Sequence, residues 1–283
     1  MKSAAMRRAA HALKAIARLC VCCLLLFPAA AAEEANAGTE LRVMAYNIHH
    51  GEGMDGKVDL DRIAGIILAY APDVVCLQEV DRHLSRTDRL DFPAILAEKT
   101  GMRAVFDANY RFDNGEYGNA TLTRLDVVSW RNIPLPNPKN KEPRGCLILT
   151  VRWDGREVDI MNTHLGLDAE ERLAQAKAII SEVRDVPTIL AGDLNEQHSA
   201  PGMRHLLERF RDTYIPAADT PAGTVPTTNP RRRIDFILAT EHWETVSFSI
   251  VDSPETRIAS DHLPVFVALR LLPQNAQEKG RER

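Results

Sequence analysis

Apolar runs alternate along the chain with segments whose apolar residues recur at helical spacing. The stretches "LRVMAYNI" (41–48) and "PDVVCLQEV" (72–80) are short apolar runs typical of buried strands. Between them, "LDRIAGIILAY" (60–70) has apolar residues at offsets of 0, 3, 4 and 7 from Ile63, which predicts an amphipathic helix. The folded part of the chain therefore opens with a strand, a helix and a strand.

The same patterns continue toward the C-terminus without an internal repeat or a linker. Further helices are predicted over 92–101, closed by Gly101, over 168–183, capped by Asp168, and over 202–210. Further strands are predicted over 117–124, 126–133, 145–153, 157–165, 187–195, 233–240, 244–251 and 263–271. This order predicts one domain, residues 38–273, with mixed sheets and outer helices. The polar tail 274–283 is expected to be disordered.

The first 37 residues are organised like a secretory signal. Residues 1–18 carry five basic side chains and no acid, and 14 apolar residues (19–32) follow. A run of this length is shorter than the about 20 residues that span a bilayer as a helix, so cleavage after Ala32 or Ala37 is favoured over a permanent anchor. We therefore expect residues 1–37 to be removed and the mature protein to be exported, to the periplasm or the extracellular space.

Composition indicates a globular protein without a strong attraction for polyanions. The chain has 283 residues, 45% hydrophobic and 26% charged, which is enough to bury a sizeable core. Without residues 1–37, which hold five of 35 basic and two of 39 acidic residues, the formal charge is −7. Non-specific binding to a phosphate backbone is therefore disfavoured, although a local basic patch stays open. The two remaining cysteines, Cys76 and Cys146, lie in apolar runs and are expected to be buried thiols.

Polar residues recur where the predicted strands end. They are Asn47, Gln78, Glu79, Asn162, His164, Asp193 and Asn195, with Asp235 inside a strand and the pair Asp261 and His262 just before the last one. Strand ends on one edge of a layered protein converge, so these residues are expected to share a cleft.

The residue types favour a site for a hard metal ion. Carboxylate and amide oxygens suit Mg²⁺ or Mn²⁺, whereas zinc sites need histidine or cysteine at characteristic spacings. After the predicted signal the chain has no HExxH, CxxC, GxSxG or GxxxxGK[ST] motif. Metal-assisted attack of water on a phosphate ester is the chemistry that these residues leave open.

Seven stretches carry a family resemblance through their content and their order. They are "MAYNIHHG", "LQEVD", "GNATLTR", "NTHLG", "GDLNE", "RIDFIL" and "SDHLPV". Together they resemble the endonuclease/exonuclease/phosphatase superfamily over about residues 41–270. The resemblance implies an α/β fold, a four-layer αββα sandwich of two packed, mostly antiparallel sheets flanked by helices. It also implies hydrolysis of phosphate esters that depends on Mg²⁺ or Mn²⁺.

The resemblance assigns the metal ion and the attacking water to five residues. Glu79 would be the principal metal ligand, with Asn47 beside it and Asp261 on the second side. Asp193 would orient or deprotonate the attacking water, and Asn195 would hold the water or a phosphate oxygen.

Two histidines complete the implied catalytic set. His164 would donate a hydrogen bond to a phosphoryl oxygen in the transition state. Asp235 would pair with His262, fix its tautomer and raise its basicity. Because side chains alternate along an extended chain, Asp261 and His262 are expected to point apart.

Three further positions are candidates for substrate contacts. His49 stands where several nucleases of the superfamily place an acid, so it is a candidate ligand or substrate contact, while for its neighbour His50 a plain loop histidine is an equal alternative. Asn119 either lines the cleft or forms a turn. Arg144 either contacts phosphate or is an ordinary surface residue.

Export and the acidic mature chain favour a lipid or small-molecule phosphodiester as the substrate. The alternative is an extracellular nuclease, for which Arg231, Arg232 and Arg233 could reach a DNA or RNA phosphate chain or else form a solvated loop. The expected partner is thus a phosphate ester, borne by a phospholipid, a small molecule or a nucleic acid. No obligate protein partner is indicated, and we expect a monomer.

Overall fold

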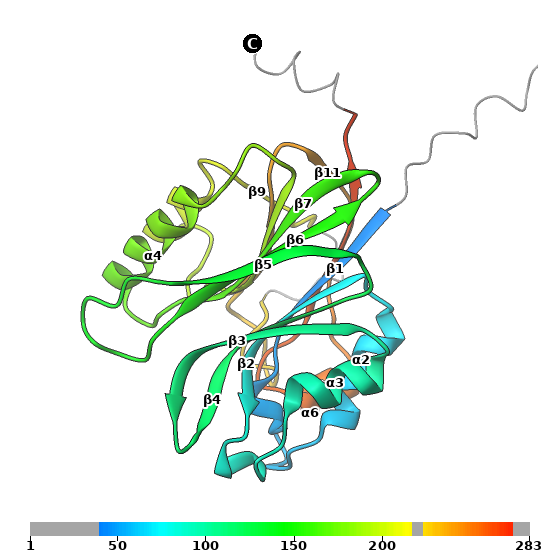
Figure 1. Ribbon diagram of the computed structural model, residues 1–283, viewed down its shortest axis with the longest axis vertical. Coiled ribbons are helices and arrows are strands. Elements are labelled where there is room, and N and C mark those ends of the chain that lie inside the picture. The colour runs from blue at the N-terminus through cyan, green and yellow to red at the C-terminus, as the bar shows by residue number, and fades with distance from the viewer. Residues whose placement is uncertain (1–39, 217–222, 274–283) are drawn as a thin grey trace, which may run out of the picture. The chain divides into compact units, whose positions relative to one another are not determined.

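The computed structural model describes residues 40–216 and 223–273, which form two sheets with helices outside them (Figure 1). The predicted signal peptide 1–37 and the tail 274–283 lie outside the described residues. Within the described ranges, no helix is long and apolar enough to cross a membrane.

The first sheet has six strands in the order β11-β12-β1-β2-β4-β3. They are β1 (Glu40–Asn47), β2 (Val74–Arg82), β3 (Arg103–Phe112), β4 (Gly115–Thr123), β11 (Trp243–Ile250) and β12 (Val265–Leu271). β1 and β2 are parallel, and the other neighbours are antiparallel. The helices of this half are α2 (Leu60–Tyr70), α3 (Phe92–Thr100) and α6 (Pro254–Ala259), with short 3-10 turns η1 (His49–Gly51) and η2 (Ser85–Thr87).

The second sheet also has six strands, in the order β5-β6-β7-β8-β10-β9. They are β5 (Val127–Pro134), β6 (Gly145–Trp153), β7 (Arg156–His164), β8 (Thr188–Asp193), β9 (Arg211–Asp212) and β10 (Asp235–Ala239). β7 and β8 are parallel, and the other neighbours are antiparallel. The helices of this half are α4 (Ala169–Ser181) and α5 (Pro201–Leu206).

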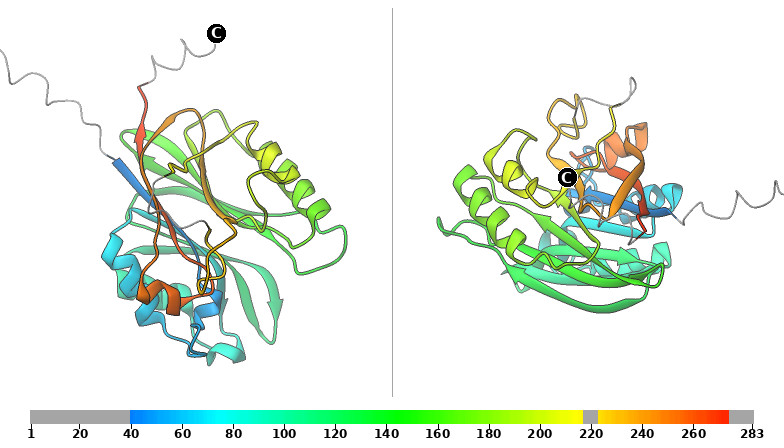
Figure 2. Two further views of the ribbon diagram at one scale, coloured as in Figure 1. Left: turned by 180° about the vertical axis from the view of Figure 1, so that it is seen from behind. Right: turned by 90° about the horizontal axis from the view of Figure 1, so that it is seen from above.

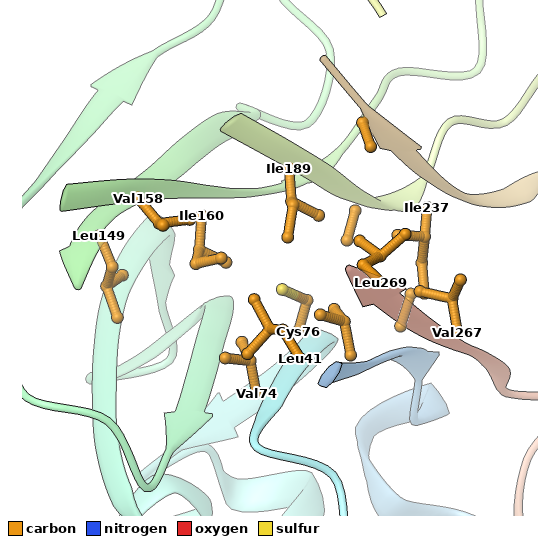
Figure 3. Packing of buried hydrophobic residues seen from close by; sticks show 14 of the residues in the cluster. Leu41, Val74, Cys76, Leu149, Val158, Ile160, Ile189, Ile237, Val267 and Leu269 are labelled. Carbon is orange, nitrogen blue, oxygen red and sulfur yellow. The ribbon is translucent and has the colours of Figure 1, made fainter. Parts of the chain in front are cut away.

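Three groups of buried apolar side chains hold these layers together. The central group, which includes Leu41, Val74, Leu149 and Ile189, comes from both sheets and fills the space between them (Figure 3). A second group joins the first sheet to α2, α3 and α6, and a third joins the second sheet to α4 and α5. The order helix, sheet, sheet, helix is a four-layer αββα sandwich, visible from two sides in Figure 2.

Capping residues set the helix ends that the sequence indicates. The Asp168 carboxylate accepts hydrogen bonds from the backbone N–H groups of Glu170 and Glu171 at the start of α4. Gly101 adopts φ 64° directly after α3, a left-handed conformation that glycine adopts without steric cost. Both predicted caps are confirmed. Cys76 and Cys146 are buried and unpaired with each other, as expected.

Several short or weakly buried elements were not predicted. β3 is the edge strand of its sheet, so few of its side chains are buried. No apolar run therefore marks it in the sequence. α6 has six residues and β9 two, too short to show a period. The helix predicted over 202–210 covers only Pro201–Leu206.

Candidate active site

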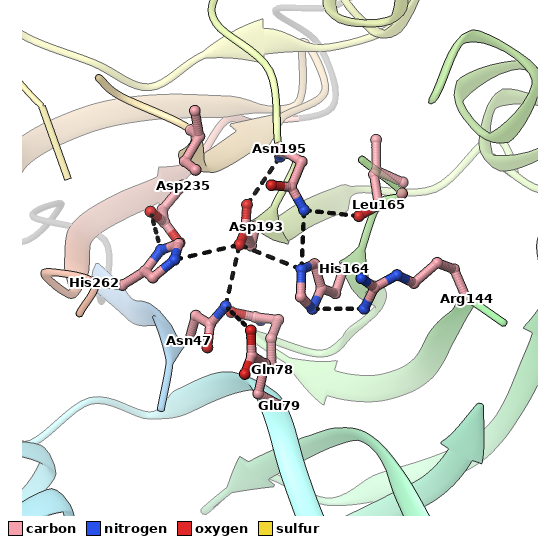
Figure 4. Close-up of polar contacts among 12 residues, drawn as sticks. Asn47, Gln78, Glu79, Arg144, His164, Leu165, Asp193, Asn195, Asp235 and His262 are labelled. Carbon is pink, nitrogen blue, oxygen red and sulfur yellow. Dashed lines mark hydrogen bonds and ion pairs between the residues drawn. The ribbon is translucent and has the colours of Figure 1, made fainter. Parts of the chain in front are cut away.

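Polar residues from both sheets meet at one edge of the sandwich. Asn47 ends β1, while His164 and Asp193 end the parallel strands β7 and β8, where they are register partners. Asp235 begins β10 and lies opposite Asp193 in the antiparallel pair with β8. Strand ends far apart in sequence therefore converge, as the sequence predicted (Figure 4).

Glu79 lies inside β2 at a bulge. The pairing of β2 with β4 shifts register between Leu77 and Val80, and Glu79 has a φ of 58°. A bulge of this kind re-aims a side chain, and the Glu79 carboxylate reaches the amide of Asn47 at the end of the neighbouring strand.

Asn47 links the two carboxylates that the cleft presents. Its Nδ2 donates to Glu79 Oε1 at 3.0 Å and to Asp193 Oδ2 at 3.1 Å. Its Oδ1 accepts from the backbone N–H of His49 at 3.0 Å. In this orientation Asn47 holds two acids in place, and its oxygen accepts one main-chain hydrogen bond, which leaves a second lone pair.

Glu79 is ionised despite its burial. Burial opposes the charged form, but the nearby His50, whose Nδ1 lies 3.8 Å from Glu79 Oε2, the Asn47 hydrogen bond and the charge of His262 hold the pKa of Glu79 far below its usual range. His50, for which the sequence leaves a plain loop histidine as an equal alternative, is thus a neighbour of the principal carboxylate.

His262 is paired with Asp235, the partner that the resemblance implied. The Nδ1 atom of His262 lies 3.1 Å from Asp235 Oδ1 and 2.9 Å from Oδ2, and both residues are buried. Burial alone would lower the pKa of His262, but the charge and hydrogen bond of Asp235, followed by the charges of Asp193 and Asp261, raise it to about 10. His262 is therefore an imidazolium near neutral pH.

The pKa of Asp193 is also raised, which for a carboxyl group favours the neutral form. Burial and the charge of the adjacent Asp235 raise the pKa of Asp193 to about 7. Its Oδ1 accepts from the backbone N–H of Asn195 at 2.9 Å, and its Oδ2 lies 3.7 Å from His262 Nε2. Asp193 is thus an acid poised to take up a proton near neutral pH.

His164 lies on the other side of Asp193. Its Nε2 is 3.0 Å from Asn195 Nδ2 and 3.4 Å from Asp193 Oδ2, and its Nδ1 is 3.0 Å from a guanidinium nitrogen of Arg144. Burial, followed by the charge of Arg144, holds the pKa of His164 well below its usual range. The two histidines of the site therefore carry different charges.

Asp261 and His262 do not point apart. They lie in a bend before β12 rather than in an extended strand, and Asp261 Oδ1 is 4.0 Å from His262 Nε2. The expectation was wrong because side chains alternate only along extended backbone. Asp261 is more exposed than its neighbour and faces the same cleft.

The cleft over these residues has a volume of about 440 Å³. Its lining includes the expected residues His49, Glu79, Arg144, His164, Asp193, Asn195, Asp261 and His262. It also includes His50, Arg86, Tyr110, Phe112, Tyr117, Glu142 and Leu167, which sequence reasoning missed. The aromatic residues come from the β3–β4 hairpin, whose approach to the cleft no local sequence pattern reveals.

Comparison with known proteins agrees with this arrangement. The model of the endonuclease/exonuclease/phosphatase family matches residues 44–262. The chain belongs to this family. It is 24% identical over 245 residues to the uncharacterized protein YbhP of Escherichia coli, covering 81% of this chain and 96% of YbhP. Members of the family are phosphoesterases and nucleases that depend on a divalent metal, so the chain is a hydrolase of phosphate esters.

Solved structures share the fold of the family. The endonuclease/exonuclease/phosphatase of Beutenbergia cavernae is 31% identical, with a TM-score of 0.70, and the match covers 82% of this chain and 72% of that chain. A mannosyl-6-phosphatase of Bacteroides thetaiotaomicron is 20% identical, with a TM-score of 0.67, and the match covers 81% of this chain and 99% of that chain.

Not every candidate lies in the cleft of this family member. Asn119 is buried in β4, where its Nδ2 donates to the backbone oxygens of Gly145 at 3.2 Å and Asn162 at 3.3 Å. It therefore joins the two sheets beneath the cleft and forms no turn. Arg233 forms an ion pair with Asp212, so this side chain is already neutralised and is not part of the cleft lining.

Two separate sets of donors could hold a divalent cation. One ligand atom each from Asp193, Asp235 and His262 lie within 4.8 Å of one another. The ionised Glu79 and the more exposed Asp261 line the same cleft and offer hard oxygen donors. As a ligand through Nε2, His262 would have to lose its Nε2 proton while Nδ1 keeps the hydrogen bond to Asp235, whereas the second set leaves the imidazolium intact.

Proposed function

We propose that the chain is a Mg²⁺- or Mn²⁺-dependent phosphodiesterase that acts on lipid or small-molecule diesters. The observation that carries this proposal is the convergence, in one cleft, of an ionised carboxylate, an acid poised to accept a proton and an imidazolium. These groups are Glu79, Asp193 and His262. Attack of water on phosphorus needs the same three properties: charge neutralisation, a proton acceptor and a proton donor.

The chain's own residues have separable tasks in this reaction. Asp193, held by Asn47 and by the Asn195 backbone, accepts the proton of the attacking water. Asn195 directs its amide into the same space and positions the water or a phosphoryl oxygen. His262, kept protonated by Asp235, donates its Nε2 proton to the leaving oxygen.

The donors present fit a hard cation at Glu79 and Asp261. Glu79 supplies a carboxylate that is ionised even when buried, and Asp261 supplies a second from the exposed side. A divalent ion bound there would neutralise charge on the phosphoryl oxygens. Asn47 supports this set by holding Glu79 at 3.0 Å, and the second lone pair of its Oδ1 is available as a further oxygen donor.

The charges of the cleft support a diester of limited size over a nucleic acid. The acidic residues of its described lining are Glu79, Glu142, Asp193 and Asp261, and its arginines are Arg86 and Arg144. Each arginine is already paired, Arg86 with Asp81 at 2.6 Å and Arg144 with Glu142 at 2.8 Å. A polyanion would meet little unpaired positive charge here.

Aromatic side chains form one wall of the cleft, which favours a substrate that carries an organic group. The rings of Tyr110 and Phe112 have centroids 4.8 Å apart, and the Arg86 guanidinium lies 5.8 Å from the Phe112 ring and 5.3 Å from the Tyr117 ring. This wall offers an apolar, polarisable surface beside the reacting groups. It suits the alcohol portion of a diester.

A substrate panel tests the proposal. The mature protein, residues 38–283, is assayed with Mg²⁺ and with chelator on sphingomyelin, phosphatidylinositol phosphates, nucleotides, mannose 6-phosphate, plasmid DNA and RNA. We expect chelator-sensitive hydrolysis of a lipid or small-molecule diester, with DNA and RNA left intact. Preferential cleavage of nucleic acid would replace the substrate class with the nuclease alternative, and preference for the sugar monoester would make the enzyme a phosphatase.

Export is a separate part of the proposal and rests on residues 1–37. The full-length chain is expressed in a Gram-negative host, and the N-terminus of the protein from each fraction is sequenced. We expect a periplasmic or secreted protein that begins after Ala32 or Ala37. An intact N-terminus in the cytoplasmic or membrane fraction would remove this part and leave the catalytic proposal unchanged.

A further inference from the structure

Arg144 lies beneath the cleft with its charge directed at a histidine. It precedes β6 and is buried to 92%, since its relative exposure is 8%. One guanidinium nitrogen, Nη1, lies 3.0 Å from His164 Nδ1 (Figure 4). The same nitrogen lies 2.8 Å from Glu142 Oε1. Arginine has donors and no acceptor, so His164 Nδ1 must accept this hydrogen bond.

This contact determines which nitrogen of His164 carries the proton. A neutral imidazole has one N–H and one acceptor nitrogen. With Nδ1 accepting from Arg144, the proton lies on Nε2, where Asp193 Oδ2 is an acceptor 3.4 Å away. The alternative tautomer would set Nδ1–H against the guanidinium N–H groups and leave it without an acceptor.

Asn195 is the competing donor to the same ring. Its Nδ2 lies 3.0 Å from His164 Nε2 and also donates to the Leu165 carbonyl at 2.9 Å. The hydrogen bond to Leu165 survives in either tautomer. A charged donor forms a hydrogen bond about twice as strong as a neutral one. The hydrogen bond from Arg144 to Nδ1, rather than one from Asn195 to Nε2, therefore determines the tautomer of His164.

A purely structural role explains the position of Arg144 poorly. Its Nε is buried without a hydrogen-bond partner, and its carboxylate partner Glu142 is 41% exposed. An unsatisfied buried donor costs about 1–3 kcal/mol, whereas a partly solvated ion pair contributes about 0–1 kcal/mol. The favourable use of the side chain is its contact with His164.

The two histidines of the cleft are thus controlled by opposite partners. Asp235 accepts from Nδ1 of His262, and Arg144 donates to Nδ1 of His164. Both rings present Nε2–H toward the same oxygen of Asp193, at 3.7 Å and 3.4 Å from Oδ2. One ring is a cationic donor and the other is a neutral donor.

We infer that Arg144 is a positioning residue that keeps the proton of His164 on Nε2, so that the neutral ring donates a hydrogen bond to a phosphoryl oxygen of the substrate. The inference rests on the proposed function for its catalytic consequence. Its structural content, the tautomer, does not depend on the substrate.

The tautomer is measured by NMR on the mature protein labelled with ¹⁵N-histidine, with His164→Gln to assign the signal. At pH 7.5 we expect His164 to show an acceptor-type Nδ1 and a protonated Nε2. R144M, which keeps the apolar stem and removes the donors, is expected to introduce the Nδ1–H form. R144K, which restores a charged donor, should return the signal toward the wild type.

Kinetics give the catalytic half of the test. Loss of one donor to a developing oxyanion costs about 10²–10³ in kcat, so R144M is expected to lower kcat by about 10²-fold while KM changes little. R144K should recover part of kcat. Arg131→Met is the matched control. Arg131 lies on β5, forms an exposed ion pair with Glu182 and is not part of the cleft lining, so this change should leave kcat unchanged.

Glu142→Gln separates the contact with His164 from the ion pair. It replaces the carboxylate that pairs with Arg144 by a neutral amide and should leave the His164 tautomer as in the wild type. A wild-type His164 with its proton on Nδ1, or an R144M spectrum unchanged from the wild type, would overturn the inference. If R144M does not fold, the wild-type and R144K spectra decide it. Absence of any hydrolysis would refute the proposed function but not the tautomer.

Discussion

Asp235→Asn isolates the charge that keeps His262 protonated. The change preserves shape, and the amide oxygen can still accept from His262 Nδ1, so it removes the charge rather than the contact. In the wild-type protein the pKa of His262 is about 10 against an ordinary value of 6.5. At about 1.4 kcal/mol per pKa unit, the protein stabilises the protonated form of His262, relative to a histidine in water, by on the order of 5 kcal/mol.

Removing this charge should lower the protonated fraction of His262 at pH 7.5. Burial acts in the opposite direction to Asp235, whereas the charges of Asp193 and Asp261 remain, so the pKa of His262 in the variant falls from about 10 toward its ordinary value of 6.5. At that ordinary value about a tenth of the rings carry the proton at pH 7.5. We expect kcat to fall by up to about tenfold from protonation alone, and by up to about 10⁴-fold if general acid catalysis is lost entirely.

Two substrates with different leaving groups make the assay specific. p-Nitrophenolate departs without a proton more readily than phenolate, so D235N should lose less activity on bis-p-nitrophenyl phosphate than on diphenyl phosphate. Asp159→Asn, which removes another buried carboxylate, paired with Arg184 at 2.8 Å and absent from the cleft lining, controls for loss of a buried charge. Equal losses on both substrates, or a His262 that NMR shows to be neutral in the wild type at pH 7.5, would refute the reasoning.

Two other predictions follow from single residues. Glu79→Gln should raise the Kd for Mg²⁺ at least about tenfold by calorimetry, whereas the surface change Glu98→Gln should not; an unchanged Kd would place the metal ion elsewhere. Gly192→Ala should destabilise the fold by more than about 2 kcal/mol in urea unfolding, because its Cβ would lie 1.9 Å from the Thr163 carbonyl oxygen at a φ of 147°. Gly65→Ala in α2, with nothing within 4 Å of the added methyl group, should instead stabilise by about 0.5–1 kcal/mol; similar effects for both would contradict this packing.

The sequence predicted most of the sandwich because buried strands appear in it as apolar runs. β6 (Gly145–Trp153) matches its predicted range, and α2 (Leu60–Tyr70) matches its apolar period. β3 escaped because an edge strand has little buried surface to mark it. The bulge at Glu79 escaped because register shifts depend on the partner strand.

Only part of the candidate site could likewise be predicted from the sequence. Asp193, Asp235 and His262 were identified because polar residues are conspicuous beside apolar strands, and the structure brings them together. The aromatic residues Tyr110 and Phe112 lie on a hairpin whose path over the cleft is set by tertiary packing, so no spacing could reveal them. Asn119 was misplaced because an amide that joins two sheets has the same local sequence as one that lines a cleft.

The proposed reaction is metal-dependent attack of water on phosphorus. Hydrolysis of bis-p-nitrophenyl phosphate in H₂¹⁸O by the mature protein, with Mg²⁺ or with chelator, tests it when the label is located by mass spectrometry. We expect one ¹⁸O atom in the p-nitrophenyl phosphate product, with product formation lost in chelator. Label in the p-nitrophenol, or equal hydrolysis without the metal ion, would contradict it.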